Sequence, residues 1–185
     1  MPGKIPPLGA VELEKPVAIE KRVGAPSEGI QIYTDGSALN NPGPGGYGVI
    51  LMIDGEYTEL AQGYQHTTNN RMEMMAVITA LEGIEGADRK RSIVVHSDSQ
   101  YTINGITKGW AKNWRRKGWK KADGKPALNP DLWKRMLEIA EELPKLSFKW
   151  VKGHAGDPLN ERADELANGA AQGVDGMRVD EGYVN

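Results

Sequence analysis

Two short apolar runs in the sequence, IQIYT at residues 30–34 and IVVHS at residues 93–97, each end in an aspartate followed by a small residue. In open α/β sheets, ligands bind beyond the carboxyl ends of such strands, so Asp35 and Asp98 are expected to be neighbours. Each aspartate has an alternative role as a turn former or a helix cap. The paired occurrence of the two favours a functional site.

Two further acids lie on predicted helices. Glu73 is in the first turn of a helix that Thr68 and its neighbours are expected to cap, and Asp164 lies one turn after Asn160 in a helix that Pro158 introduces. Taken alone, each is a surface acid, and Glu73 is also one that the helix dipole stabilises. Convergence with the two aspartates would make them part of one site.

Carboxylates that meet at one point repel one another, so they must take up protons or hold cations. Hard oxygen ligands favour Mg²⁺ or Mn²⁺, and the chain has no cysteine that could supply a thiolate. Two such ions about 4 Å apart can activate a water and stabilise a departing sugar oxygen. The predicted chemistry is therefore in-line phosphodiester cleavage.

The three histidines differ in their surroundings. His154 lies between Gly153 and Gly156, in a loop from which it could reach the site and carry protons or help a product leave; its alternative is a plain exposed loop histidine. His96 is interpreted as a hydrogen-bonded core or sheet residue, and His66 as a loop or capping residue.

A basic segment gives the chain a predicted nucleic-acid face, although the net charge is only −2. Between Lys108 and Lys125 the only acid is Asp123. Tryptophans alternate with cations there, which suits stacking on bases or sugars together with phosphate binding. The alternative is an amphipathic helix that buries Trp110 or Trp114, whereas the cations stay exposed on either interpretation. The cations expected to bind substrate include Lys117, Lys120 and Lys121.

Side-chain amides near the predicted acid cluster offer hydrogen-bond donors and acceptors for base edges and 2′-hydroxyls. These residues are Asn41, Asn69, Asn70 and Gln100. Turn and helix-cap roles compete with substrate binding for all four.

The order of elements predicts an α/β fold with a mixed sheet and helices packed on its faces. Expected strands are 30–34, 47–53, 57–64, 92–97 and 146–151. Expected helices run from Asn69 to near Gly83 or Gly86, from Ser99 onward, from Asn129 to Leu143, and from Pro158 onward.

Length and composition predict one soluble domain. We expect a flexible extension over residues 1–28, a folded domain over 29–172 and a flexible tail over 173–185, because both ends lack sustained apolar periodicity. No apolar run approaches the roughly 18 residues that a membrane span needs, and no export signal is visible. A cytoplasmic monomer with no membrane and no obligate protein partner is expected.

Five motifs in order resemble type 1 ribonuclease H: YTDGSALNNPGPGGYG, TTNNRMEMMAV, SDSQY, GWKKADGKPALNPDLW and WVKGHAGDPLNERADELA. The match spans residues 30 to about 171. The resemblance implies a five-stranded sheet of order 3-2-1-4-5. It also implies a Mg²⁺-dependent endonuclease, with Mn²⁺ as a possible substitute, that cuts the RNA strand of RNA–DNA hybrids and leaves 5′-phosphate and 3′-hydroxyl ends.

Residue roles carried over from the resemblance are as follows. Asp35, Glu73, Asp98 and Asp164 match the metal site, and His154 matches a mobile histidine. Trp110, Trp114 and the cations around them match a basic protrusion that grips the DNA strand, whereas Thr68 and Asn129 match a DNA phosphate pocket. The RNA strand would contact the positions of Asn41, Asn69, Asn70 and Gln100.

Two alternatives remain open on the residues alone. The chain could be a hybrid-binding protein that has lost catalysis, although all motif acids are present. It could also be a related nuclease or strand-transfer enzyme that acts on DNA, since carboxylates and two metals do not by themselves select the sugar.

Overall fold

The computed structural model describes residues 11–13, 29–153, 155–173 and 176–184. Its strands form one mixed sheet in the order β1-β4-β3-β2-β5-β6, with β7 also paired to β4. The strands are β1 (Val11–Leu13), β2 (Ile30–Ala38), β3 (Gly43–Ile53), β4 (Glu56–Thr67), β5 (Ile93–Ser97), β6 (Leu146–Trp150) and β7 (Met177–Arg178). The predicted order 3-2-1-4-5 is confirmed for β4-β3-β2-β5-β6, and two short strands extend that sheet.

Pairing direction changes at β2. On one side β2, β3 and β4 form an antiparallel meander, and on the other β2 pairs in parallel with β5, which pairs in parallel with β6. The hairpin between β3 and β4 turns at Asp54 and Gly55, both with positive φ, as the Asp-Gly pair predicts. The carboxyl ends of β2 and β5 therefore lie at the same end of the sheet.

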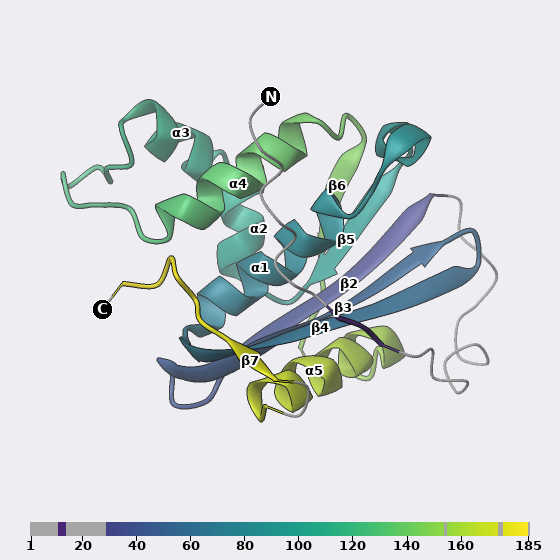
Figure 1. Cartoon of the computed structure of the whole chain (residues 1–185). Coiled ribbons are helices and arrows are strands. Elements are labelled where there is room, and N and C mark those ends of the chain that lie inside the picture. The colour runs from purple at the N-terminus through teal and green to yellow at the C-terminus, as the bar shows by residue number, and fades with distance from the viewer. Residues whose placement is uncertain (1–10, 14–28, 154, 174–175, 185) are drawn as a thin grey trace.

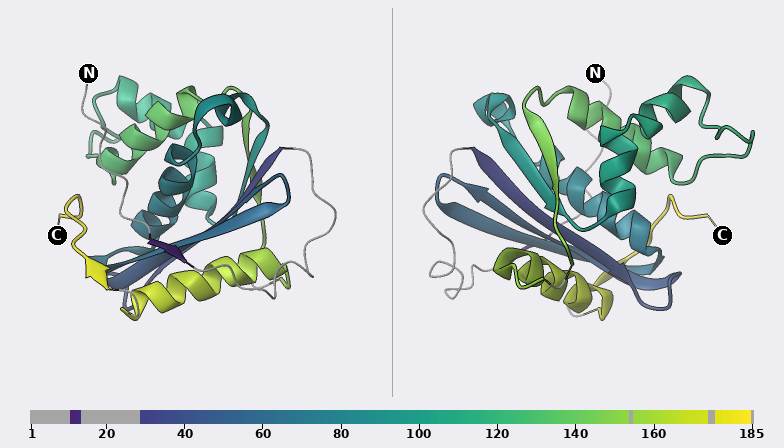
Figure 2. Two further views of the ribbon diagram at one scale, coloured as in Figure 1. Left: turned by 45° about the vertical axis from the view of Figure 1, so that its right-hand side comes forward. Right: turned by 180° about the vertical axis from the view of Figure 1, so that it is seen from behind.

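Helices cover both faces of the sheet (Figures 1 and 2). They are α1 (Asn69–Glu82), η1 (Gly86–Lys90), α2 (Gln100–Thr107), α3 (Trp110–Arg116), α4 (Pro130–Glu141) and α5 (Pro158–Ala171). Helices α1 to α4 lie on one side of the sheet and α5 lies alone on the other. Among the described residues, no helix combines the length and the apolar character that crossing a lipid bilayer requires.

Helix α1 lies in the middle of the larger core. Residues 71–81 are all buried, because the helix packs against β2 and β3 on one side and α4 on the other. Successive side chains of β2 point to opposite faces of the sheet and so contribute to two different cores. Ile32 packs with α1, whereas Tyr33 packs with the smaller core beside α5. The strand that ends near Asp35 is thus held from both faces.

The C-terminal segment differs from the flexible tail expected over 173–185. In its described part, β7 pairs in parallel with Gly63 and Tyr64 of β4, and the Asp180 side chain is buried. A buried ion pair between Arg71 and Asp180 holds the described part of this segment, and hydrophobic periodicity does not register an ion pair. The extension expected over 1–28 lies outside the described residues, apart from Val11–Leu13, which form β1.

Helix α5 approaches the sheet closely because glycines in β3 and β4 face it. A Cβ atom on Gly48 would lie 2.5 Å from the Ala163 carbonyl oxygen and 2.6 Å from Leu166 Cβ. Both distances are well below van der Waals contact, and one of the atoms belongs to the helix backbone. The glycine therefore sets the depth at which α5, and Asp164 on it, lies against β3.

We predict that Gly48→Ala lowers the free energy of unfolding by about 1 to 3 kcal/mol, since overpacking must push α5 away from the sheet. Urea denaturation followed by circular dichroism measures the change. Gly169→Ala is the matched control: it lies in α5 with no atom within 4 Å of the added Cβ, so it should raise stability by up to about 1 kcal/mol. Equal effects of the two substitutions would contradict the packing argument.

Candidate active site

The carboxyl ends of β2 and β5 carry the two aspartates that the sequence singles out. Tyr33 is opposite His96 in the parallel register, so Asp35 and Asp98, each two residues further on, are level with each other. Single ligand oxygens of Asp35, Glu73 and Asp98 all lie within 4.8 Å of one another. The predicted proximity of Asp35 and Asp98 is confirmed.

Glu73 reaches the aspartates because the start of α1 touches β2 at Gly36. A Cβ on Gly36 would lie 2.3 Å from the Glu73 backbone nitrogen and 2.4 Å from the Met72 carbonyl carbon. Only glycine allows this approach. Thr68 caps the helix, where its Oγ1 accepts a hydrogen bond from the Arg71 amide, as the sequence predicts.

Asp164 comes from the opposite face of the sheet, on α5. Its side chain is close enough to Asp35 for a shared hydrogen bond to affect the pKa of Asp35. The helix is capped by Asp157, whose carboxylate accepts from the amides of Leu159 and Asn160 at 2.9 and 3.3 Å. One turn after Asp164, Asn168 accepts a hydrogen bond of 3.1 Å from Ser37 Oγ, which ties the helix to β2.

Burial and mutual repulsion shift Asp35 and Glu73 toward their neutral forms. Burial, with Asp164 and Asp98 as further causes, raises the pKa of Asp35 to about 8, and the pKa is lowered only partly by Glu73. Burial, together with the charges of Asp35 and Asp98, raises the pKa of Glu73 well above its ordinary value. Without a cation the cluster would therefore hold protons near neutral pH.

The donor set fits a hard divalent cation. Glu73 Oε2 is fully buried and has no hydrogen-bond partner among the described residues. An unsatisfied buried carboxylate oxygen is costly in free energy, whereas coordination by a cation would satisfy it. All ligands in the cluster are carboxylate oxygens, which suit Mg²⁺ or Mn²⁺ better than softer metals.

The family model for RNase H matches residues 27–172 of this sequence. The chain belongs to the RNase H family. Ribonuclease H of Desulforamulus reducens is 51% identical over 143 residues, which cover 77% of this chain and 87% of the relative. On these grounds the protein is a ribonuclease H, an endonuclease among the hydrolases, and the resemblance to type 1 enzymes seen in the motifs is confirmed.

Solved structures of the family have the same fold. LC9-RNase H1, a type 1 RNase H with the type 2 active-site motif, is 32% identical with a TM-score of 0.65, and the match covers 82% of this chain and 75% of that one. LC11-RNase H1 in complex with an RNA/DNA hybrid is 29% identical with a TM-score of 0.52, covering 77% of this chain and 96% of the other.

Of the three histidines, two can be compared with the expectations. His96 is 7% exposed, stacks on Tyr33 with ring centroids 4.2 Å apart, and has Nε2 2.7 Å from Gln31 Oε1, which confirms the prediction of a satisfied sheet histidine. His66 is exposed near the end of β4, with its ring 5.4 Å from that of Tyr183. His154 lies outside the described residues.

The four amide residues lie on the segments that carry the acids or on those that directly follow them. Asn69 and Asn70 open α1, Gln100 opens α2, and Asn41 is in the turn after β2; all four are exposed. Asn69 Oδ1 accepts from the Ala38 amide at 2.6 Å, and Asn41 Oδ1 accepts from the Asn69 amide at 3.0 Å. Both carbonyl oxygens are therefore engaged by backbone, which leaves the NH₂ groups of Asn41 and Asn69 to donate.

The basic segment projects from the body of the molecule as α3 and the loop that follows it (Figures 1 and 2). Trp110 is 41% exposed, with Lys108 Nζ 5.5 Å from its ring centroid. Trp114 is instead partly buried, with its ring edge-on to Trp133 at 5.9 Å. Each of the two alternatives, burial and stacking on substrate, therefore fits one tryptophan. Trp114 is partly buried and supports the protrusion, whereas the ring of Trp110 is exposed and could stack on substrate. Lys117, Lys120 and Lys121 are all exposed on it.

Thr68 and Asn129 meet around a buried arginine. Arg71, which is 2% exposed, donates its backbone amide to Thr68 Oγ1 and its Nη1 to Asn129 Oδ1 at 3.3 Å. Burial alone would lower the pKa of Arg71, but its hydrogen bonds to Asp131 and Asp180 raise the pKa above its ordinary value.

Sequence reasoning missed residues that act on the site through backbone atoms. Trp150 Nε1 donates to the carbonyl oxygen of Asp98 at 3.2 Å, and the residue is 49% exposed. A Cβ on Gly153 would lie 2.8 Å from Asp98 Oδ2, so a larger residue there would displace the Asp98 side chain. Small residues directly beside a motif acid are the signal that could have revealed Gly36, whereas no comparable signal identifies Trp150.

The raised pKa of Asp35 makes stability depend on pH. Its folded-state pKa of about 8 exceeds the ordinary 3.8, so the folded protein binds more protons between these values and loses stability as pH rises through this window. We predict that, in the absence of divalent metal, Asp35→Asn removes much of this loss of stability. At pH 8 the free energy of unfolding of the variant should exceed that of the wild type by about 2 kcal/mol.

Urea denaturation in EDTA from pH 4 to 9 measures the difference between the two proteins. Adding Mg²⁺ should stabilise the wild type more than the variant. Asp123→Asn, at an exposed acid of the protrusion, is the control and should run parallel to the wild type at every pH. A wild type that gains stability relative to Asp35→Asn as pH rises would refute the repulsion argument.

Proposed function

We propose that the protein hydrolyses the RNA strand of RNA–DNA hybrids by a two-metal-ion mechanism and leaves 5′-phosphate and 3′-hydroxyl ends. Asp35, Glu73, Asp98 and Asp164 hold the ions, which are Mg²⁺ with Mn²⁺ as a substitute. The observation that carries the proposal is the three-carboxylate group with its unsatisfied, buried Glu73 Oε2. The hybrid as substrate draws support from LC11-RNase H1, which has been solved with an RNA/DNA hybrid.

The acids of the proposed metal site differ in how exposed they are. Divalent cations, when bound, supply Lewis acidity that activates the attacking water and stabilises the charge on the departing 3′ oxygen. Glu73, held in place by its burial, provides the fixed side of the site, whereas Asp98 and Asp164 are partly exposed and lie where a phosphate could approach. His154 carries a proton or helps the product leave, a role that stays a prediction.

The RNA strand is selected by donors of fixed orientation. Because the carbonyl oxygens of Asn41 and Asn69 are occupied by backbone amides, the side chains present NH₂ groups to the substrate. Such groups pair with minor-groove acceptors and with the oxygen of a 2′-hydroxyl. Asn70 and Gln100, exposed in the first turns of α1 and α2, extend this set of contacts.

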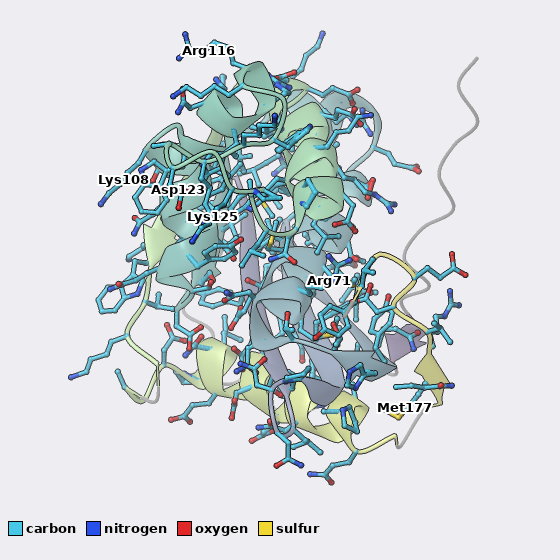
Figure 3. All side chains as sticks on the ribbon, turned by 90° about the vertical axis from the view of Figure 1, so that its left-hand side faces the viewer. Arg71, Lys108, Arg116, Asp123, Lys125 and Met177 are labelled. Atoms are coloured by element: carbon cyan, nitrogen blue, oxygen red, sulfur yellow. The ribbon has the colours of Figure 1, made fainter. Side chains whose placement is uncertain are left out.

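The DNA strand is held at two places. The protrusion contributes Trp110 for stacking and Lys117, Lys120 and Lys121 for phosphates. Trp114 supports it by packing against the core. The pocket of Thr68 and Asn129 binds a DNA phosphate. In Figure 3 the protrusion residues Lys108, Arg116 and Lys125 lie on the side of the molecule that faces the viewer. We further propose that residues 29–172 form the catalytic domain and that the protein works in the cytoplasm as a monomer.

We predict that a labelled RNA–DNA hybrid is cut only in its RNA strand when Mg²⁺ is present, whereas duplex RNA and duplex DNA stay intact. Both strands are labelled and sized, and the product ends are identified by their sensitivity to phosphatase. Asp35→Asn should bind the hybrid with nearly unchanged Kd while kcat falls by about 10³-fold or more, because the substitution removes an interaction with the metals.

Each other outcome identifies a different function. Binding without any cutting by the wild type would indicate a hybrid-binding protein, and cutting of the DNA strand would indicate a DNA nuclease. Full turnover by Asp35→Asn would remove that residue from the mechanism.

Salt dependence tests the protrusion. Replacing Lys117, Lys120 and Lys121 together with alanine should weaken hybrid binding and reduce the slope of log Kd against log salt by about one for each phosphate that is no longer neutralised. Fluorescence anisotropy at several salt concentrations measures the slope. The control is Lys90→Ala with Lys145→Ala, two exposed lysines at the opposite ends of the strands, for which an unchanged slope is expected. Equal slopes for all three proteins would contradict the role of the protrusion.

A further inference from the structure

Arg71 is a buried cation whose hydrogen-bonding capacity is fully used. It donates from Nη1 and Nη2 to the two oxygens of Asp131 at 2.9 and 2.7 Å, and from Nε and Nη2 to the two oxygens of Asp180 at 2.7 and 3.0 Å. The remaining Nη1 hydrogen goes to Asn129 Oδ1. Five donors in a rigid plane therefore meet three partners from different parts of the chain.

The C-terminal segment is fastened at the start of α1. Asp180 Oδ2 also accepts a hydrogen bond of 2.7 Å from Thr67 Oγ1, and the side chain of Asp180 is 1% exposed. The Tyr183 ring lies against that of His66. In Figure 3 the yellow C-terminal segment passes Arg71 after it leaves β7. A segment more than 100 residues away in sequence thus supports the residues around the cap of α1.

Arg71 passes this support to both residues of the phosphate pocket. Asn129, in a left-handed conformation with φ 55°, is held at both ends of its amide: Oδ1 accepts from Arg71 Nη1, and Nδ2 donates to the Tyr101 hydroxyl at 3.2 Å. Thr68 Oγ1 accepts from the Arg71 backbone amide. One residue therefore donates hydrogen bonds to both side chains of the pocket.

We propose that Asp180 and Arg71 are positioning residues for the DNA strand: the C-terminal segment orients Asn129 through the Arg71 guanidinium, and it holds the chain beside Thr68 through the hydrogen bond from Thr67 to Asp180. The inference rests on the proposed function and assigns the segment after residue 176 to substrate binding. Neither Asp180 nor Arg71 touches the nucleic acid or the reacting atoms.

The physical basis is preorganisation. Removing the Asp180 charge leaves a buried guanidinium with half of its ionic partners, so Arg71 must turn toward Asp131 or admit water. Either change alters its contact with Asn129, and part of the substrate's binding free energy must then go into ordering the pocket. The carboxylate cluster has its own supports at Gly36 and α5, so the chemical step is spared.

The experiment measures KM and kcat separately on an RNA–DNA hybrid, with the full chain and at a temperature where all variants are folded. Asp180→Asn should raise KM about tenfold and leave kcat within about twofold. Asp180→Ala, which removes both acceptors, should raise KM further; if it fails to fold, Asp180→Asn still decides. Glu82→Gln is the matched control, because Glu82 joins α1 to α4 through Arg135 at the far end of α1 and should leave KM unchanged.

A double-mutant cycle separates positioning from general loosening of the fold. Thr68→Val and Asp180→Asn should be non-additive in KM, since both act on one pocket, whereas Lys120→Ala and Asp180→Asn should be additive. A KM for Asp180→Asn equal to that of Glu82→Gln, or additive effects with Thr68→Val, would overturn the inference. A wild type that does not cut hybrids would instead refute the proposed function, so the two failures are distinguishable.

Discussion

Repulsion among carboxylates at one end of the sheet is the constraint on which the rest of the structure depends. Asp35, Glu73 and Asp98 can be held within 4.8 Å only if strong packing forces them together, because burial and like charge both oppose it. The two strands, the buried helix α1 and the glycine contact at Gly36 supply that force. The fold therefore stores an unfavourable arrangement that a divalent cation would relieve.

The two layers of helices divide the work around this cluster. Helix α1 brings Glu73 and the amides of its first turn from one face, and α5 brings Asp164 from the other. The strands between them carry Asp35 and Asp98 in a register that hydrogen bonding fixes. A rigid site of this kind favours reactions in which positioning and electrostatics supply most of the rate enhancement.

Much of this could be predicted from the sequence, where a pattern has a local cause. The positions of Asp35 and Asp98 could be predicted from two apolar strands that each end at an aspartate, and the role of Thr68 from helix capping. The strand order could be predicted from the motif resemblance. Glu73 and Asp164 could not be placed by spacing alone, since their approach depends on the glycines that let α1 and α5 come close. Arg71 and Asp180 were missed for a related reason: a buried ion pair between distant segments leaves no periodic trace, and composition indicated a loose tail.

The short strands β1 and β7 have a consequence for the protein at high concentration. Both pair along β4, at Glu59–Ala61 and at Gly63–Tyr64, and so occupy hydrogen-bonding groups that an outermost strand of the meander would otherwise present to other molecules. At the opposite margin, β6 is only five residues long. Lys149 within it and Lys145 just before it are both exposed. Strand-to-strand aggregation of folded molecules is thus disfavoured at both margins, by added chain at one and by brevity and positive charge at the other.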